Sequence, residues 1–283
     1  MAKWHEKLFR WYVAGRDHPA KLRLVRWLSP KLIPAEGVLC NVTGVNMWLH
    51  PEDDIEGQLY RGIGYETNTL EFMRRNLNAG DNAVIAGANT GLHLITAALS
   101  VGEQGTAVGV EPQPLSLHRL MQNIHSNPVR AKVCVVSGGL GETHSLVPMS
   151  EAPPDHTGWG SFVLRDPGRT PYQIQVVAYD TITEQLALPS VKLMLLDVEG
   201  YEMQALRGMS PANCPDILLI EVQNIVLSLT KTTPQEYFDA VGALGYQTWN
   251  MDGQRAFVNE PIIENNLVCV KQGVALPRWI EKV

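Results

Sequence analysis

The sequence predicts a doubly wound α/β fold, in which helices cover both faces of a mostly parallel sheet. Between residues 82 and 137, short apolar segments typical of strands alternate with amphipathic segments typical of helices. Two later segments, 191–200 and 215–223, are almost continuously apolar, as expected of strands buried on both faces. The chain has 283 residues, of which 45% are hydrophobic and 18% charged, so its composition indicates a globular protein and excludes a disordered or fibrous one.

The predicted elements of the main domain follow the order β-α-β-α-β, pause at an insertion and then resume. The predicted strands cover residues 82–87, 105–112, 131–137, 191–200 and 215–223. The predicted helices cover residues 90–102, 114–127, 179–186, 201–208 and 233–245, with caps at Thr181 (paired with Glu184) and Thr233. Residues 138–178 predict an inserted hairpin or pair of edge strands, and an antiparallel pair is expected among residues 246–253, 255–261 and 265–272.

The first 34 residues differ in charge from the rest of the chain. They carry eight basic and two acidic residues, although the whole chain has a formal net charge of −6. Their apolar residues recur at helical spacing and predict two short amphipathic helices, which break near residues 15–19 and end at Pro30 and Pro34. We expect these helices to form a cap on the main domain or on a dimer partner. A lid over a substrate and a membrane-surface anchor are the alternatives.

The segment between these helices and the first strand of the sheet is also predicted to be ordered. Residues 38–50 alternate as strands do, residues 51–57 indicate a turn, and residues 67–77 predict a helix capped by Thr67 or Asn68. We therefore divide the chain into an N-terminal basic amphipathic helical extension, residues 1–50, and a main domain, residues 51–283.

Charge, hydropathy and cysteine spacing exclude several classes of protein. The net negative charge argues against a broad basic surface for nucleic acid. No run of 18 apolar residues occurs, so no transmembrane segment is predicted, and no secretory leader is recognisable. The four cysteines are far apart and form no CxxC pair, which argues against a zinc ribbon or a disulfide framework. We expect a cytoplasmic protein without a nucleic-acid partner.

A glycine-containing turn, Gly87-Ala88-Asn89-Thr90-Gly91, joins the first strand of the predicted sheet to its helix. The N–H groups at such a helix start favour anionic groups, and open α/β sheets bind ligands where the strand order reverses. Glu111 ends the next strand, where a carboxylate can accept both hydroxyl groups of a ribose. The turn reads GxNxG, without the middle glycine that a pyrophosphate needs, which favours S-adenosylmethionine over NAD.

Several segments together resemble the FkbM-type S-adenosylmethionine-dependent methyltransferases. They are GDNAVIAGANTG (80–91), AVGVEPQP (107–114), LHRLMQNIHSN (117–127) and VKLMLLDVEGYEMQALRG (191–208). The most specific part is DVEGYE followed by LRG, and Tyr65-Glu66 also matches the family. The resemblance covers roughly residues 55–270 and implies a seven-stranded, Rossmann-like class I methyltransferase domain. Ile85 departs from the family, which commonly has an acid at this position of the turn (DVGAN).

The resemblance also implies where S-adenosylmethionine is bound. Glu111 is expected to bind the ribose, and the residues around Gly87 are expected to wrap the methionine end. Asp197, at the end of a central strand, is expected to face the amino-acid end or the methyl group. The full set of cofactor-binding residues that it implies is Tyr65, Glu66, Gly87, Ala88, Asn89, Gly91, Glu111, Pro112, Ser137, Gly138 and Asp197.

Candidate catalytic residues are acids near the ends of the central strands. Methyl transfer from a sulfonium requires alignment and exclusion of water, and a base is needed only for a poor nucleophile such as an alcohol. Asp197, Glu199 and Glu221 are the candidates, and His93 is a weaker one. Structural alternatives are that Asp197 only holds cofactor, that Glu199 and Glu202 complement a helix dipole, and that Glu221 caps a buried strand.

A metal and an aromatic pocket wall were also considered. Oxygen ligands for Mg²⁺ are present at the strand ends, in Asp197, Glu221, Gln223 and Asn224. Their spacing is not that of a compact metal motif, so no metal is expected. Trp159 and Phe162 in the insertion either wall the acceptor pocket or pack as an ordinary hairpin.

The expected function is O-methylation of a hydroxyl group on a sugar or a secondary metabolite, and this acceptor class comes from the resemblance. One alternative is N-methylation of an amide side chain of a peptide. Another is a catalytically inactive S-adenosylmethionine-binding protein, and a third is a nicotinamide oxidoreductase. The expected partners are a small-molecule or peptide methyl acceptor and a second copy of the chain, bound through the N-terminal helices.

Overall fold

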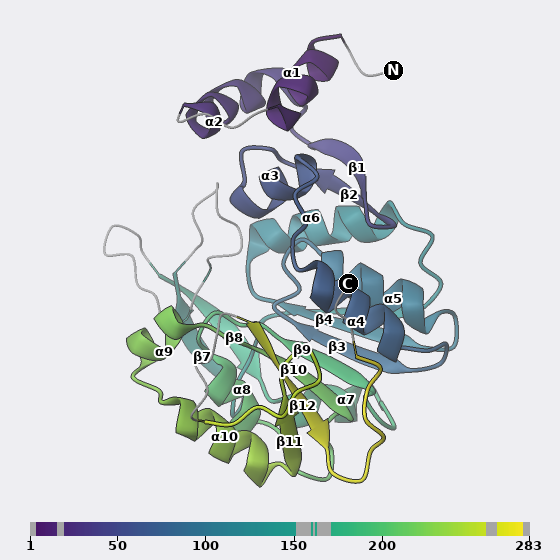
Figure 1. Ribbon diagram of the computed structural model, residues 1–283, viewed down its shortest axis with the longest axis vertical. Helices are drawn as coiled ribbons and strands as arrows, with labels where there is room; N and C mark the ends of the chain where they lie inside the picture. The colour runs from purple at the N-terminus through teal and green to yellow at the C-terminus, as the bar shows by residue number, and fades with distance from the viewer. Residues whose placement is uncertain are drawn as a thin grey trace.

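Figure 1 shows the computed structural model of the chain, which describes residues 4–15, 20–150, 160, 162, 171–258 and 265–279. Its centre is a seven-stranded sheet with the strand order β11-β12-β10-β9-β3-β4-β5. The strands are β3 (Asn82–Ala86), β4 (Thr106–Glu111), β5 (Lys132–Ser137), β9 (Leu193–Leu196), β10 (Ile217–Val222), β11 (Tyr246–Trp249) and β12 (Asn265–Lys271). Neighbours from β10 to β5 are parallel, whereas β12 is antiparallel to both β10 and β11. The predicted doubly wound, mostly parallel sheet is confirmed.

The direction in which the sheet grows reverses between β3 and β9. From β3 the chain continues outward to β4 and β5, whereas β9 leads to β10 on the other side. In open α/β sheets this reversal leaves a crevice at the carboxyl ends of the two strands. The topology therefore places a ligand site where β3 and β9 end.

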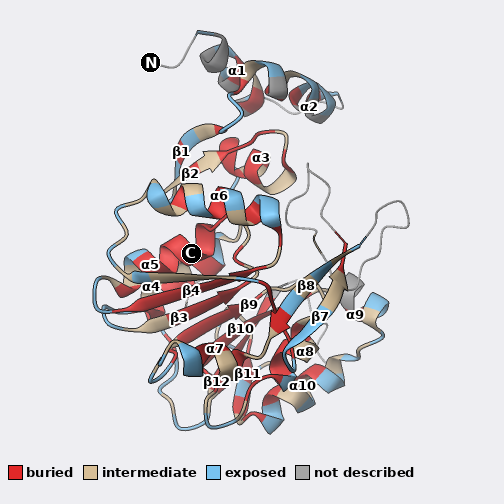
Figure 2. Ribbon diagram, turned by 180° about the vertical axis from the view of Figure 1, so that it is seen from behind, coloured by how far each residue is buried: buried red, intermediate tan, exposed pale blue. Residues whose placement is uncertain are grey.

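Helices cover both faces of the sheet, and alternate residues of each strand supply the two cores (Figure 2). Val84 and Ala86 of β3 belong to the hydrophobic cluster under α7 (Tyr179–Gln185), α8 (Glu202–Arg207) and α10 (Pro234–Ala243). Ala83 and Ile85 face the opposite cluster, under α4 (Thr67–Asn76), α5 (Leu92–Val101) and α6 (Pro114–His125). Burial on both faces explains why the central strands are continuously apolar in sequence.

The insertion after β5 forms a second, three-stranded sheet with the order β6-β8-β7. β7 (Ser145–Met149) and β8 (Tyr172–Val177) pair antiparallel, as the predicted hairpin requires, and the two-residue β6 (Gly139–Leu140) pairs parallel with β8. Figure 2 shows this sheet beside the carboxyl ends of the central strands, with much of β7 and β8 exposed. Trp159 lies outside the described residues.

The N-terminal segment packs on the α4–α5 side of the sheet through a third hydrophobic cluster. The cluster joins the two amphipathic helices, α1 (Trp4–Ala14) and α2 (Lys21–Leu32), to a hairpin, β1 (Val38–Val42) and β2 (Val45–Leu49), and to α3 (Asp54–Tyr60). The outer faces of the two helices remain exposed, with Trp4, Trp11 and Trp27 each more than half accessible. Among the described residues, no helix is long and apolar enough to cross a membrane.

Three local predictions in the N-terminal half were wrong. Pro30 does not end α2, which continues to Leu32 and closes with a hydrogen bond from the Ile33 N–H to the Ser29 carbonyl. Residues 51–57 are more than a turn, because the Asp53 carboxylate accepts the Glu56 N–H and starts α3. The predicted N-cap of α4, Thr67 or Asn68, is also too late in the chain: Glu66 takes this position, in a left-handed conformation.

Predictions in the C-terminal half had mixed outcomes. The Thr233 cap is confirmed, with a complete capping box to Glu236. The Thr181 cap is wrong, because α7 already begins at Tyr179 and Thr181 lies inside it. Residues 255–258 contain an isolated bridge rather than a strand, and α9 (Asn224–Thr230) was not predicted.

Candidate active site

A cavity lies at the carboxyl ends of β3, β4 and β9, where the topology places the crevice. Eight of the predicted site residues line it: Tyr65, Gly87, Asn89, Glu111, Pro112, Gly138, Asp197 and Glu199. Its other lining residues are Ile55, Val110, Gln113, Gly139, Leu140, Gly160, Phe162 and Val198. The predicted residues that are not part of this lining are Glu66, Ala88, Gly91, Ser137 and Glu221.

Gly87 allows the carboxyl ends of β3 and β9 to approach each other. Its φ of +81° is in the left-handed region, and a Cβ atom here would overlap the backbone carbonyl oxygen of Asp197. The N–H groups of Gly87 and Ala88 both donate to the Val110 carbonyl oxygen, at 3.0 and 3.1 Å. The turn is therefore tied to both neighbouring strands, and its backbone faces the cavity.

Glu111 is buried at the end of β4, and both of its carboxylate oxygens accept backbone hydrogen bonds. Oε2 accepts the Asn89 N–H and Oε1 accepts the Gln113 N–H, each at 2.8 Å. Burial raises the pKa of Glu111 to about 7, although the two hydrogen bonds favour the charged form. Since a carboxylate oxygen has more than one acceptor position, both oxygens can still accept hydroxyl groups from the cavity.

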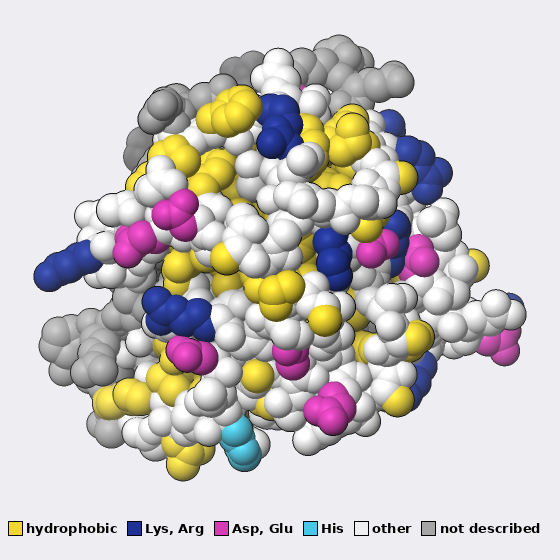
Figure 3. Space-filling view, turned by 90° about the horizontal axis from the view of Figure 1, so that it is seen from below, with side chains coloured by type: hydrophobic (Ala, Val, Ile, Leu, Met, Phe, Trp, Pro, Cys, Tyr) yellow, Lys and Arg dark blue, Asp and Glu magenta, His cyan; other side chains and the backbone are white. Residues whose placement is uncertain are grey.

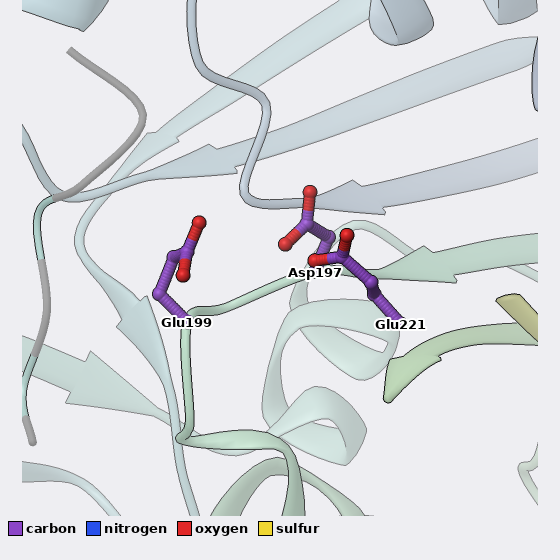
Figure 4. Close-up of side chains that lie close together, drawn as sticks. All are labelled: Asp197, Glu199 and Glu221. Carbon is purple, nitrogen blue, oxygen red and sulfur yellow. The ribbon is translucent and has the colours of Figure 1, made fainter. Parts of the chain in front are cut away.

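Asp197, Glu199 and Glu221 form an acidic cluster (Figure 4), of which Asp197 and Glu199 line the cavity. One side-chain oxygen of each residue lies within 4.8 Å of the others. Because Leu196 of β9 lies opposite Ile220 of β10, the next residues, Asp197 and Glu221, emerge side by side. All three acids were predicted separately, and the parallel register explains why Asp197 and Glu221 meet.

The ionisation of the acidic cluster is shaped by burial and by like charges. Burial, then the neighbouring Glu221, raises the pKa of Asp197 well above its usual range. Burial and the same neighbour raise the pKa of Glu199 to about 8. The Gln223 amide donates to Glu221 at 2.9 Å and holds that carboxyl group in place.

Glu202 positions the loop that carries Glu199. Its Oε1 atom accepts the N–H groups of Val198 and Gly200, at 3.2 and 3.1 Å, and its Oε2 atom accepts the Tyr237 hydroxyl at 3.0 Å. The side chain is buried, so it points into the protein rather than into the cavity. The loop needs this support because Glu199 has a left-handed φ of +50°.

Tyr65 and Glu66 approach the acidic cluster from the segment before α4. Tyr65 lines the cavity, whereas the Glu66 carboxylate lies 3.3 Å from Nε2 of the buried His93. Burial would raise the pKa of Glu66, but His93 and neighbouring hydrogen bonds lower it below its usual value. His93 thus lies beside Glu66 rather than in the cavity lining.

Other residues modify the predicted site. Ser137 is exposed and outside the lining, whereas the adjacent Gly138 lines the cavity. Ile85, which replaces the family acid, is buried in the α4–α5 core and contributes no polar group. Phe162 does line the cavity and packs on Tyr201, with ring centroids 4.8 Å apart. Gln113 was missed, although its place two residues after Glu111 at a strand end was the available signal.

Comparisons with solved structures give matches of low sequence identity. FkbM from Methylobacillus flagellatus KT is 14% identical over 94% of this chain and 58% of its own, with a TM-score of 0.40. An rRNA methylase from Streptococcus thermophilus is 10% identical, over 72% and 93% of the two chains, with a TM-score of 0.41. Fibrillarin from Aeropyrum pernix, solved with bound S-adenosyl-L-methionine, is 13% identical, over 69% and 67%, with a TM-score of 0.38.

The family comparison covers the part of the chain that builds the cavity. No curated protein matches the chain. The model of the methyltransferase FkbM domain, in contrast, matches residues 86–247, from the end of β3 into β11. This match includes the glycine turn, Glu111 and the acidic cluster, and it spans more than half of the chain. The chain therefore belongs to the FkbM methyltransferase family.

Proposed function

We propose that the chain transfers the methyl group of S-adenosylmethionine to a hydroxyl oxygen, on a sugar or a secondary metabolite. The observation that carries the proposal is the cavity at the switch point of the sheet. It brings the glycine turn and the Glu111 carboxylate together with Asp197 and Glu199. Membership of a methyltransferase family supports the reaction class and the cofactor.

The residues present fit the cofactor. The close approach of β3 to β9 at Gly87 leaves room for backbone, not for a side chain, beside the cavity. Glu111 offers carboxylate oxygens to the ribose hydroxyl groups, while Pro112 and Gly138 border the adenine. Asp197 Oδ1 is buried and has no hydrogen-bond partner among the described residues, so it is available to a ligand.

The acidic end of the cavity is the proposed reaction centre. S-adenosylmethionine supplies, when bound, an electrophilic methyl group on a positively charged sulfur. Asp197, Glu199 and Glu221 attract the acceptor hydroxyl group and take up its proton. The apolar lining residues, among them Leu140 and Phe162, exclude water that would compete with the acceptor.

Two further proposals concern the N-terminal segment. Residues 1–50 form an extension to the methyltransferase domain, 51–283, and the exposed tryptophans of α1 and α2 pack against a second copy of the chain. Light scattering of the full chain and of a Trp4→Ala/Trp11→Ala/Trp27→Ala variant tests this contact. A monomeric full chain would contradict it. The proposed compartment is the cytoplasm.

Calorimetry and methyl-release assays test the proposed function. We expect S-adenosylhomocysteine to bind with one site per chain and NAD not to bind. With radiolabelled S-adenosylmethionine, we expect turnover on hydroxyl acceptors and not on Asn- or Gln-containing peptides. Turnover on the peptides would establish N-methylation instead, and binding without turnover across a broad acceptor panel would favour an inactive binding protein. Absence of S-adenosylhomocysteine binding would refute the proposal.

A further inference from the structure

The side-chain oxygens of the acidic cluster have the spacing of a cation's coordination shell. Asp197 and Glu221 extend from the ends of adjacent parallel strands, and Glu199 extends from the loop after β9 (Figure 4). One oxygen from each lies within 4.8 Å of the other two. Oxygen ligands at about 2.0–2.4 Å from a six-coordinate cation are about 2.8 to 4.8 Å from one another. The three oxygens are thus close enough together for rotation of the side chains to bring them onto one ion.

An independent observation comes from Asn266 on β12, which pairs with Glu221 across the two strands. Asn266 is 9% exposed, and its Oδ1 atom has no hydrogen-bond partner among the described residues. Its Nδ2 atom donates to Thr69 Oγ1 at 2.8 Å. Asn266 and Glu221 line one cavity together with Glu66, Thr67, Asn68, Thr69 and Met251. Buried acceptors without donors require an explanation, such as an ion or a water molecule.

The charges around the cluster also favour a cation. Among the described residues, neither Asp197 nor Glu221 forms an ion pair with a lysine, an arginine or a histidine. Glu66, whose own partner is His93, adds a further acidic group close enough to act on Asp197. Concentrating carboxylates in a half-buried place is costly unless a positive charge compensates them. Carboxylate and amide oxygens are hard ligands, suited to Mg²⁺, Mn²⁺ or Ca²⁺ rather than to Zn²⁺.

The geometry points to a divalent-cation site formed by Asp197, Glu199 and Glu221, with the Asn266 amide oxygen beside it. The sequence-based expectation of no metal rested on linear spacing, which does not show that the three acids meet in space. The role of the ion rests on the proposed function: it binds the acceptor hydroxyl group and lowers its pKa. The acceptor oxygen then bonds to the methyl carbon and the carbon–sulfur bond breaks, its electron pair remaining on sulfur. The hydroxyl proton passes to a carboxylate oxygen that does not coordinate the ion.

Titration of the EDTA-treated full chain with MnCl₂, MgCl₂ and CaCl₂ tests the site by calorimetry, and Mn²⁺ binding is checked by electron paramagnetic resonance. We expect one ion per chain for at least one of the three metals. Glu221→Gln should weaken binding by at least about tenfold, because it removes a charged ligand. Glu199→Gln is the second variant, since its position on a loop makes it less damaging to folding. Glu103→Gln, on the exposed turn before β4, removes the same charge and should change nothing.

Parallel titrations with S-adenosylhomocysteine separate this site from the proposed function. Ion binding that both cluster variants weaken supports the site, even if S-adenosylhomocysteine does not bind and the proposed function fails. S-adenosylhomocysteine binding without saturable binding of any of the three ions at millimolar concentration overturns the site and leaves the proposed function intact. Ion binding that Glu221→Gln and Glu199→Gln leave unchanged also overturns it, because the ion must then lie elsewhere.

Discussion

Replacing Glu111 by glutamine tests the ribose end of the cavity. The wild-type carboxylate accepts two backbone hydrogen bonds of 2.8 Å in a buried position. Glutamine keeps the shape and one acceptor oxygen, but its NH₂ group faces the second N–H and cannot accept a ribose hydroxyl. Loss of a charged acceptor costs about 1–3 kcal/mol, so we expect S-adenosylhomocysteine to bind about 5- to 150-fold more weakly. Glu111→Ala should show a similar loss, but it also leaves two buried N–H groups unpaired.

The pH dependence of binding makes this prediction sharper. Burial raises the pKa of Glu111 to about 7, so about one tenth of the free protein carries the charged form at pH 6 and about nine tenths at pH 8. If the charged form binds the ribose, wild-type affinity should be about tenfold higher at pH 8 than at pH 6. Calorimetry at both pH values, with Glu111→Gln as the comparison, measures this difference. A variant with wild-type affinity, or with the wild-type pH dependence, would remove Glu111 from the site.

The same pKa shift has the opposite effect on the stability of the free protein. Because the folded-state pKa of Glu111 exceeds its unfolded value, its stabilising contribution is complete below about pH 4.5 and is lost as the pH rises through about 7. Urea denaturation without ligand should therefore show the stability of the wild type, relative to Glu111→Gln, decreasing between pH 5 and pH 8. A difference that is constant over this range would contradict the shifted pKa.

Three other substitutions test contacts that hold the site together. Gly87→Ala should lower the free energy of unfolding by more than about 3 kcal/mol in urea titrations. Its control, Gly80→Ala, also has a positive φ but leaves open space for the new methyl group, so it should cost less; equal losses would contradict the contact between Gly87 and the end of β9. Arg119→Leu should lower the free energy of unfolding by about 3–5 kcal/mol in the same assay, because it breaks a buried 3.1 Å ion pair with Glu56 of α3. A loss below about 1 kcal/mol would count against this ion pair. Glu202→Ala should lower kcat more than it raises KM for S-adenosylmethionine, because the loop that carries Glu199 loses its support. Glu202→Gln keeps the acceptor oxygen and should retain most of the activity, whereas an unchanged kcat in the alanine variant would exclude a positioning role.

Local pattern was sufficient to predict the central sheet and the residues at its strand ends. Glu111 and Asp197 could be placed because Glu111 ends the buried strand β4 and Asp197 directly follows the buried strand β9, and parallel strands bring their carboxyl ends to one edge. The pattern failed where long-range packing decides the structure. Pro30 lies within the last turn of α2, although proline usually ends a helix. For α3 a signal was available, because Asp53 and Glu56 have the spacing of a capping box.

Side-chain partners were harder to predict than positions. That Glu66 lies beside His93 depends on how the segment before α4 packs against α5. Glu202 belongs to the family motif, yet its side chain supports the loop from behind and does not enter the cavity. The direction of a side chain near a helix start depends on the backbone of the preceding loop, which sequence spacing does not specify.

Charge is divided between the two ends of the cavity rather than spread over the molecule. On the face seen in Figure 3, acidic and basic side chains are interspersed, so that face carries no broad patch of one sign. Inside the cavity, in contrast, Glu111 is satisfied by backbone N–H groups, whereas Asp197 and its acidic neighbours repel one another. The Glu111 end can accept neutral hydroxyl groups, and the acidic end at Asp197 would be stabilised by a positive charge. A sulfonium at this acidic end would be attracted in the same way as a divalent cation. Because the proposed role of the ion requires the ion and the sulfonium to be bound together, strict competition between the two ligands would contradict that role.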